Sequence, residues 1–466
     1  MTNQVNAQAS EADLDSAFIG HDDYALVRVP ESERYSWFSV ALQRFGQLSA
    51  LAQFFLAAMI GLTMGFWQAM LAITIGAVLL EIVTIFVGIA GQREGLSTSL
   101  LARWTGFGRY GSALVGVAMA ISLTGWFGVQ NEVFANGLAS IFGGPLWVWC
   151  IVGGIAVTLI VVYGFVSMNW VAYVTVPAFL LLCVFSLSAA LKSHNLSDLM
   201  SDNHPGPAMP LAFGITMVAG GFIVGAVMTP DMSRYNRSAM DVVKQTVVGV
   251  TLGEYFVGVI GVLLAHTFKT VTAEQMGQSA GLVVGLVQGS VGTIGVLILV
   301  ASILKINDWN LYPSSLGIVN AVHTFTGVRI NRAMVAIGLG VLGSILSAMG
   351  FASKFQTFLV ELGMVFPPIA AIMIADYFIV KSWRKELDES RMAGALPSHL
   401  PAVVPAGLIS WVLGYATAKG LSMFPEWIPA VNVPALVSLV AAFVVYVVLG
   451  KLGLGRGVGI HETPAA

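Results

Sequence analysis

Apolar segments long enough to cross a bilayer recur along this chain from residue 37 to residue 450. A helix needs about 20 apolar residues to span the hydrocarbon core, where lipid offers no partners for unpaired backbone groups. The segments therefore predict an all-α polytopic membrane protein. They number twelve, at residues 37–62, 66–91, 109–141, 145–165, 168–191, 209–230, 242–268, 289–320, 333–350, 352–380, 402–421 and 433–450.

The composition excludes several classes of protein. Charged residues make up 10% of the chain and hydrophobic residues 57%, whereas soluble domains carry about 25% charged residues. With 22 basic residues and a net charge of −2, no nucleic-acid partner is expected. Cys150 and Cys183 lie in apolar segments and are expected to be buried thiols. No metal-ligand cluster, nucleophile elbow or phosphate loop is present, so we expect no cofactor and no enzymatic activity.

Basic residues in the loops predict the orientation, because cytoplasmic loops carry an excess of Lys and Arg. One set of loops holds Arg93, Arg103, Arg109, Arg234, Arg237, Lys244, Arg329, Arg332, Lys381, Arg384, Lys385 and Arg391. The other set holds Lys192, Lys269, Lys354 and Lys419. The distribution predicts a protein of the cell inner membrane with both termini in the cytoplasm.

Two segments carry breaks at membrane depth, where unpaired backbone is tolerated only beside protein or a wet cavity. The sixth contains three glycines within 220–225 and ends at Thr229-Pro230, and the first contains Gly46-Gln47 with Gln53 further on. Broken helices five segments apart are typical of an inverted five-helix repeat with a midplane site.

This interpretation divides the chain into consecutive parts. They are a cytoplasmic tail (1–36), a ten-helix transport core (37–380) with repeats 37–191 and 209–380, a cytoplasmic linker (381–401), two additional helices (402–450) and a C-terminal tail (451–466).

Polar residues interrupt the eighth segment at 302–312 and suggest the wall of a transport site. A Lys or Asp at the bilayer centre costs about 2.5 to 3.5 kcal/mol even on the lenient insertion scale, so Lys305 and Asp308 need partners or an aqueous cavity. Asn307 lies two residues from Lys305, about 200° around a helix, and points to another side.

Trp126 and Gln130 are four residues apart in the third segment and therefore share a helix face. An aromatic plane beside an amide suits a planar heterocycle, because the ring can stack and the amide offers a donor and an acceptor. The equally weighted alternative is that Trp126 is packing and Gln130 bonds another helix. Phe222 in the sixth segment could cover the opposite face of the ligand, although ordinary core packing is the simpler interpretation.

Other ionisable residues within the segments are expected to be mostly structural, and Arg44 is expected to extend toward the surface. The others are Glu81, Glu132, Glu254, His266 and Glu361.

Five stretches together resemble the nucleobase-cation symporter-1 family, which includes purine, cytosine, allantoin and hydantoin permeases. They are GLSTSLLAR at 95–103, GWFG at 125–128, TPDMSRYNR at 229–237, ND at 307–308 with LY at 311–312, and PPIAAIMIADY at 367–377.

The resemblance implies a leucine-transporter-like architecture of ten core helices plus two, working by alternating access. It further implies that Trp126 and Phe222 sandwich the substrate while Gln130 and Asn307 read its edge. Gly221 stands beside Phe222 where cytosine permeases tend to carry a small hydroxyl, which argues against cytosine itself.

At the family's sodium site this chain keeps one hydroxyl, Ser302, and places Lys305 a turn further along that face. An ammonium group has no acceptor and would repel sodium, and Asp308, three residues along the same face, could hold it. Because burial disfavours the charged form of lysine, exposure to alternate sides would let it gain and lose a proton. We therefore expect sodium-independent, proton-coupled transport, with facilitated diffusion as the fallback.

The leading hypothesis is an importer of a nucleobase or related planar heterocycle, with the lipid bilayer and a small molecule as its partners. The alternatives are an amino-acid or other small-solute carrier of the same fold, or a receptor or channel-like protein without coupled transport. The sequence does not predict the oligomeric state.

Overall fold

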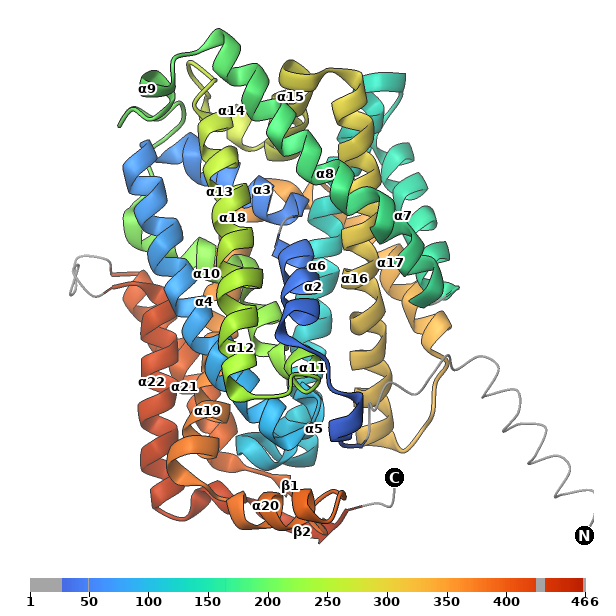
Figure 1. Ribbon diagram of the computed structural model, residues 1–466, viewed down its shortest axis with the longest axis vertical. Coiled ribbons are helices and arrows are strands. Elements are labelled where there is room, and N and C mark those ends of the chain that lie inside the picture. The colour runs from blue at the N-terminus through green and yellow to red at the C-terminus, as the bar shows by residue number, and fades with distance from the viewer. Residues whose placement is uncertain (1–26, 49, 164, 425–431, 464–466) are drawn as a thin grey trace, which may run out of the picture.

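The chain forms an elongated bundle of helices in a computed structural model that describes residues 27–48, 50–163, 165–424 and 432–463 (Figure 1). The first half comprises η1 (Glu31–Glu33), α2 (Trp37–Leu48), α3 (Leu51–Thr63), α4 (Phe66–Glu94), α5 (Thr98–Ala102), η2 (Arg103–Phe107), α6 (Gly108–Phe142), α7 (Leu146–Val162), α8 (Phe165–Ser193) and α9 (Leu196–Leu199).

The second half continues the bundle and adds two short strands. Its elements are α10 (Leu211–Val227), α11 (Thr229–Ser233), α12 (Ala239–Gln245), η3 (Thr246–Thr251), α13 (Leu252–Ala265), α14 (Ala273–Met276), α15 (Ser279–Val291), α16 (Thr293–Thr326), α17 (Arg332–Ala348), η4 (Phe351–Lys354), α18 (Phe355–Val365), α19 (Pro367–Ile374), η5 (Ala375–Val380), α20 (Arg384–Met392), β1 (His399–Val403), α21 (Pro405–Ser422), α22 (Pro434–Lys451), η6 (Leu454–Arg456) and β2 (Val458–Glu462).

Long apolar helices confirm the prediction of a helical, multi-pass membrane protein. Among the described residues, seven helices are long and apolar enough to cross a bilayer, or eight if the bent pair α2 and α3 forms one span. Four shorter apolar helices accompany them, namely α7, α10, α15 and α17. The count of twelve crossings and the inverted repeat stay predictions.

The packing of the long helices brings distant parts of the sequence together. In the described part of the chain, α6 and α16 make the most extensive contact, and α13 packs along α3. Helix α10 lies against both α4 and α18, while α21 and α22 pair at one side of the bundle (Figure 1). The two expected halves of the core therefore interleave, so a site between them draws on both.

The predicted break in the first segment coincides with a bend of 51° between α2 and α3. The predicted break at 220–225 is wrong, because α10 continues as a helix through these glycines and ends at Val227. The chain leaves the helix at Met228 and resumes at Thr229, with Pro230 in the first turn of α11, where its missing N–H costs nothing.

The glycines of α10 serve close packing instead. A Cβ atom at Gly220 would overlap the carbonyl oxygen of Leu359, and one at Gly363 would lie 2.6 Å from that of Thr216. Small residues at both positions thus let the backbones of α10 and α18 touch, as is common between membrane helices.

Three further expectations differ from the structure. Helix α15 lies in the stretch expected to be a loop. A search for bilayer-spanning segments does not detect it, because its 13 residues are too few to span a bilayer. The helix expected from residue 402 begins at Pro405, because the residue before a proline is driven out of the helical region. The stretch expected to be a C-terminal tail contains β2, which pairs antiparallel with β1 beside α20 (Figure 1).

Gly220→Ala should destabilise the protein by about 1 to 3 kcal/mol, because the added methyl group overpacks the contact between α10 and α18. Gly285→Ala on α15 is the matched control, since nothing lies within 4 Å of the position that its methyl group would take and alanine favours helix. Thermal unfolding of the purified variants measures the difference. Equal midpoints for the two variants would contradict the packing role.

Candidate functional site

Helix α6 presents a buried aromatic ring and a buried amide one turn apart. Trp126 is 5% exposed, and its ring packs edge-on against Phe355 and Phe358 of α18, with centroids 5.6 and 5.7 Å away. Gln130 is 1% exposed, and its Oε1 has no hydrogen-bond partner among the described residues. A buried acceptor without a donor is costly, so Oε1 of Gln130 is suited to receive a donor from a ligand.

Helix α16 meets this face through a second amide. Asn307 is fully buried, and its Nδ2 donates to the carbonyl oxygen of Phe127 at 3.5 Å. Its Oδ1 accepts from Nδ2 of Asn310 at 2.9 Å. The bond to Phe127 shows that Asn307 contacts α6 next to Trp126 in the sequence, whereas its predicted role in binding the edge of a substrate stays a prediction.

Helix α10 carries Phe222 and Gly221, the two remaining residues predicted to bind the substrate. Phe222 is partly exposed, and the guanidinium of Arg44 lies 5.4 Å from its ring centroid. The ring contacts of Trp126 described above are to α18, so the predicted sandwich of a ligand between Trp126 and Phe222 stays a prediction. The carbonyl oxygen of Gly221 accepts from Nε2 of Gln53 at 3.2 Å.

Gln53 of α3 is a site residue that sequence reasoning did not assign. It is 4% exposed, and its Oε1 has no partner among the described residues. The available signal was a lone amide in an otherwise apolar helix segment. Its link to Gly221 depends on a contact between residues far apart in sequence, which one chain alone does not reveal.

Arg44 does not extend toward the surface as expected. Its side chain is 2% exposed, and it donates to the hydroxyl of Thr229 and to the carbonyl oxygen of Gly225, 3.2 Å away. A further bond joins it to Oε1 of Gln47 at 3.3 Å. Arg44 therefore ties α2 to the junction of α10 and α11, where helix termination leaves carbonyl groups to satisfy.

The charged pair on α16 forms as its spacing suggested. Nζ of Lys305 lies 3.0 and 3.1 Å from the two carboxylate oxygens of Asp308, whose side chain is fully buried. The Lys305 ammonium also lies 5.8 Å from the ring centroid of Trp309. Ser302, one turn earlier, donates its hydroxyl to the carbonyl oxygen of Leu299 at 2.7 Å.

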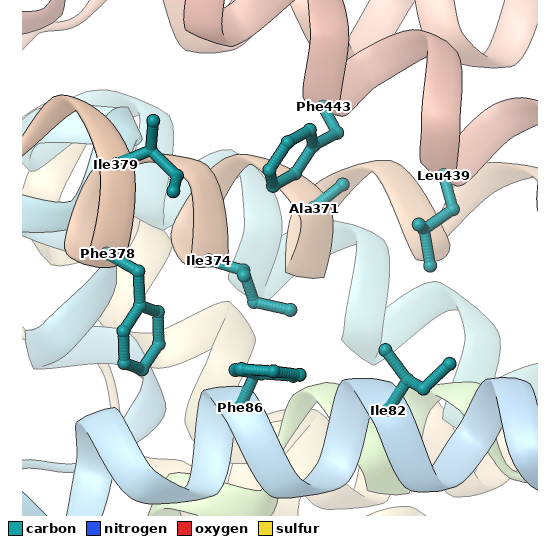
Figure 2. Close-up of a pocket in the computed structure, with 8 residues that line it drawn as sticks. All are labelled: Ile82, Phe86, Ala371, Ile374, Phe378, Ile379, Leu439 and Phe443. Carbon is teal, nitrogen blue, oxygen red and sulfur yellow. The ribbon is translucent and has the colours of Figure 1, made fainter.

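An apolar groove of about 280 Å³ lies away from these residues, between α4, α19, η5 and α22 (Figure 2). Only hydrocarbon and aromatic side chains line it: Ile82, Phe86, Ala371, Ile374, Phe378, Ile379, Leu439 and Phe443. These side chains offer no hydrogen-bond partner for the polar edge of a heterocycle, so we do not assign the substrate site to this groove.

Comparison with known proteins decides the family. Residues 28–439 match the family model of permeases for cytosine/purines, uracil, thiamine and allantoin. The chain belongs to this family. It is similar to the cytosine permease of Escherichia coli strain K12, with 26% identity over 405 residues, covering 86% of this chain and 88% of that permease.

Two further relatives agree with this assignment. The hydantoin permease of Microbacterium maritypicum is 25% identical over 381 residues, covering 76% of this chain and 73% of that protein. The inward-facing structure of Mhp1 superposes with a TM-score of 0.73 at 21% identity, covering 92% of this chain and 93% of that chain, and shows the shared fold. These relatives are transporters rather than enzymes, as the sequence predicted.

Lys305→Ala should cost about 3 to 5 kcal/mol of stability, because it leaves the buried carboxylate of Asp308 unpaired. The double variant Lys305→Ala/Asp308→Asn should recover part of that loss. Lys385→Ala is the control, since Lys385 and Glu389 form an exposed pair 3.8 Å apart, worth about 0 to 1 kcal/mol. A double variant less stable than Lys305→Ala in thermal unfolding would contradict this account.

Proposed function

We propose that this permease imports a nucleobase or related planar heterocycle through a site between α3, α6, α10 and α16. The family and its cytosine and hydantoin permeases support this substrate class. Trp126 provides an aromatic plane on which a heterocycle can stack.

The unpaired buried oxygen of Gln130 is the observation that carries the proposal. Oε1 of Gln53 is likewise buried and has no partner among the described residues, so α3 and α6 each offer an amide oxygen that could accept from donors on a ligand. Ring N–H groups of a nucleobase or hydantoin would supply those donors. An amino acid would need a partner for its carboxylate as well as its ammonium group, and the paired Lys305 offers little of its charge for that role.

We further propose a transport core of twelve spanning helices that works by alternating access. Residues 37–191 and 209–380 would form the inverted repeats, and α21 and α22 would be the two additional helices. Both termini would lie in the cytoplasm of a cell whose inner membrane holds the protein. The basic residues of α20 at the end of the bundle that holds β1 and β2 support this orientation (Figure 1).

For coupling, we propose that Lys305 replaces the sodium ion and that the proton gradient drives import. An ammonium group held by Asp308 already supplies a positive charge beside Ser302, where a cation would be repelled. The pair would release a proton on one side of the membrane and take one up on the other. This cycle would couple proton movement to substrate movement.

Trp126→Ala and Gln130→Ala should each weaken substrate binding by about 1 to 3 kcal/mol, through loss of stacking and of a buried hydrogen bond respectively. Gln130→Ala should also change the ranking of analogues, whereas Trp126→Ala should weaken all of them. A competition panel of cytosine, uracil, purines, allantoin and hydantoins measures both effects. Trp147→Ala, at a tryptophan that is 57% exposed on α7, is the matched control. Unchanged affinity in well-folded Trp126→Ala protein would refute the stacking role.

Uptake into proteoliposomes should persist when choline replaces sodium and should fall when the proton gradient is collapsed. Lys305→Ala and the double variant Lys305→Ala/Asp308→Asn should both lose the response to the gradient. A requirement for sodium in the unmodified protein would overturn the coupling proposal. Binding without any accumulation would favour a receptor, and accumulation limited to equilibration would favour facilitated diffusion.

A further inference from the structure

Glu254 is an unpaired acid in the middle of the bundle. It lies on α13 and is 3% exposed, and neither of its carboxylate oxygens has a hydrogen-bond partner among the described residues. An ionised carboxylate in such surroundings pays the full cost of desolvation with no compensation. The neutral acid avoids that cost, so the surroundings favour a bound proton.

Glu254 and Gln53 line the same small void. The void has a volume of about 10 Å³ and lies between α3, α4, α10 and α13. Its polar lining residues are Glu254 and Gln53, and the rest of its lining is carbon-bearing side chains and glycine. Nε2 of Gln53 donates to the carbonyl oxygen of Gly221, so one amide both lines the void of the acid and bonds to a residue of the candidate site.

A second acid reinforces the neutral form of Glu254. Glu81 of α4 accepts a hydrogen bond from the hydroxyl of Thr251, which precedes Glu254 by three residues. Two neighbouring carboxylates in apolar surroundings resist simultaneous ionisation. Glu81 thus has a hydrogen-bond donor, whereas neither carboxylate oxygen of Glu254 has a partner among the described residues.

Few other charged groups face this acid from the elements packed on α13. Helix α3 carries no acidic or basic residue, and α2 carries Arg44, whose guanidinium bonds to Thr229 and Gly225. The described part of α8 carries Lys192 near its far end. In the described chain, Glu81 is therefore the charge that bears most directly on Glu254.

We propose that Glu254 is a proton-binding site of this permease. The hydrogen bonds of Gln53 would change with the protonation of Glu254 and so alter the substrate site. A neutral Glu254 can donate its O–H to the unpaired Oε1 of Gln53, which leaves Nε2 on Gly221. An ionised Glu254 can only accept, so it competes for Nε2 and withdraws it from Gly221. This inference rests on the proposed function, because it takes Gly221 to be part of the substrate site and transport to be proton-coupled.

A proton fits this place better than a metal ion. The void has room for about one water molecule, and a sodium ion would find a single amide oxygen and one carboxylate among carbon atoms. The site is also separate from Lys305, which lies on α16. Two protonatable groups would then stand on different helices of the core.

Modification by dicyclohexylcarbodiimide tests the proton site without any transport measurement. A protonated carboxyl group in apolar surroundings adds across the carbodiimide, and mass spectrometry locates the product. Glu254 should be labelled at acidic pH and lose the label as pH rises, and Glu254→Gln should lack it. Glu94 is the matched internal control, since it is equally buried but ion-paired with Arg28 and Arg391. Glu81→Gln should reduce labelling of Glu254, because the repelling charge is gone.

Infrared difference spectra of the unmodified protein and Glu254→Gln give a second measurement in case the reagent cannot reach the acid. A protonated-carboxyl band should be present in the former, disappear at high pH, and be absent from the variant. The absence of both the label and the band would overturn the proposal. Protection of Glu254 from labelling by sodium chloride, but not by choline chloride at the same pH, would also overturn it, because it would indicate a sodium site. Failure of the unmodified protein to take up any of radiolabelled cytosine, uracil, purines, allantoin and hydantoins would refute the proposed function and leave this test intact.

Discussion

The lack of hydrogen-bond partners in lipid governs where this chain can place its polar groups. Several buried charged side chains described in the bundle have identifiable partners, and the kinds of partner differ. Arg44 uses the hydroxyl of Thr229 and the carbonyl group of Gly225, while Lys305 uses Asp308 on its own helix. At the end of the bundle that holds α20, Glu94 binds Arg28 and Arg391 at 2.9 and 2.8 Å. Helix packing follows from these pairings as much as from apolar contact.

Three of the exceptions to this pairing bear on the proposed site and on the proposed proton group. Gln130, Gln53 and Glu254 are each at least nine-tenths buried and have side-chain oxygens without partners among the described residues. Unsatisfied buried groups reduce stability and are therefore uncommon, so each of these three calls for an explanation. A bound substrate and a bound proton, as proposed above, would each supply the missing partners.

Sequence alone was sufficient where the information is local. Segment hydrophobicity located the long helices, and the spacing of three residues brought Lys305 to Asp308. It was insufficient where the answer depended on a distant partner. The glycines at 220–225 suggest a helix break from sequence, but in the structure Gly220 packs against the backbone of Leu359. The role of Gln53 likewise follows from its hydrogen bond to Gly221, a residue far away in the sequence. Apolar composition does not distinguish a helix that unwinds from one that packs closely, because glycine serves both purposes.

Helix α3 is the element that both proposed proton groups can influence. It packs along α13, which carries Glu254, and it also contacts α16, which carries Lys305. Coupling between sites requires an element with two arrangements whose balance each site shifts. The bend of 51° between α2 and α3 separates Arg44, which is bonded to Thr229 and Gly225, from Gln53, which is bonded to Gly221. If Glu254 binds a proton as proposed, its effect would reach the substrate site through Gln53 on α3, because that amide is the side chain that lines the void of Glu254 and bonds to Gly221.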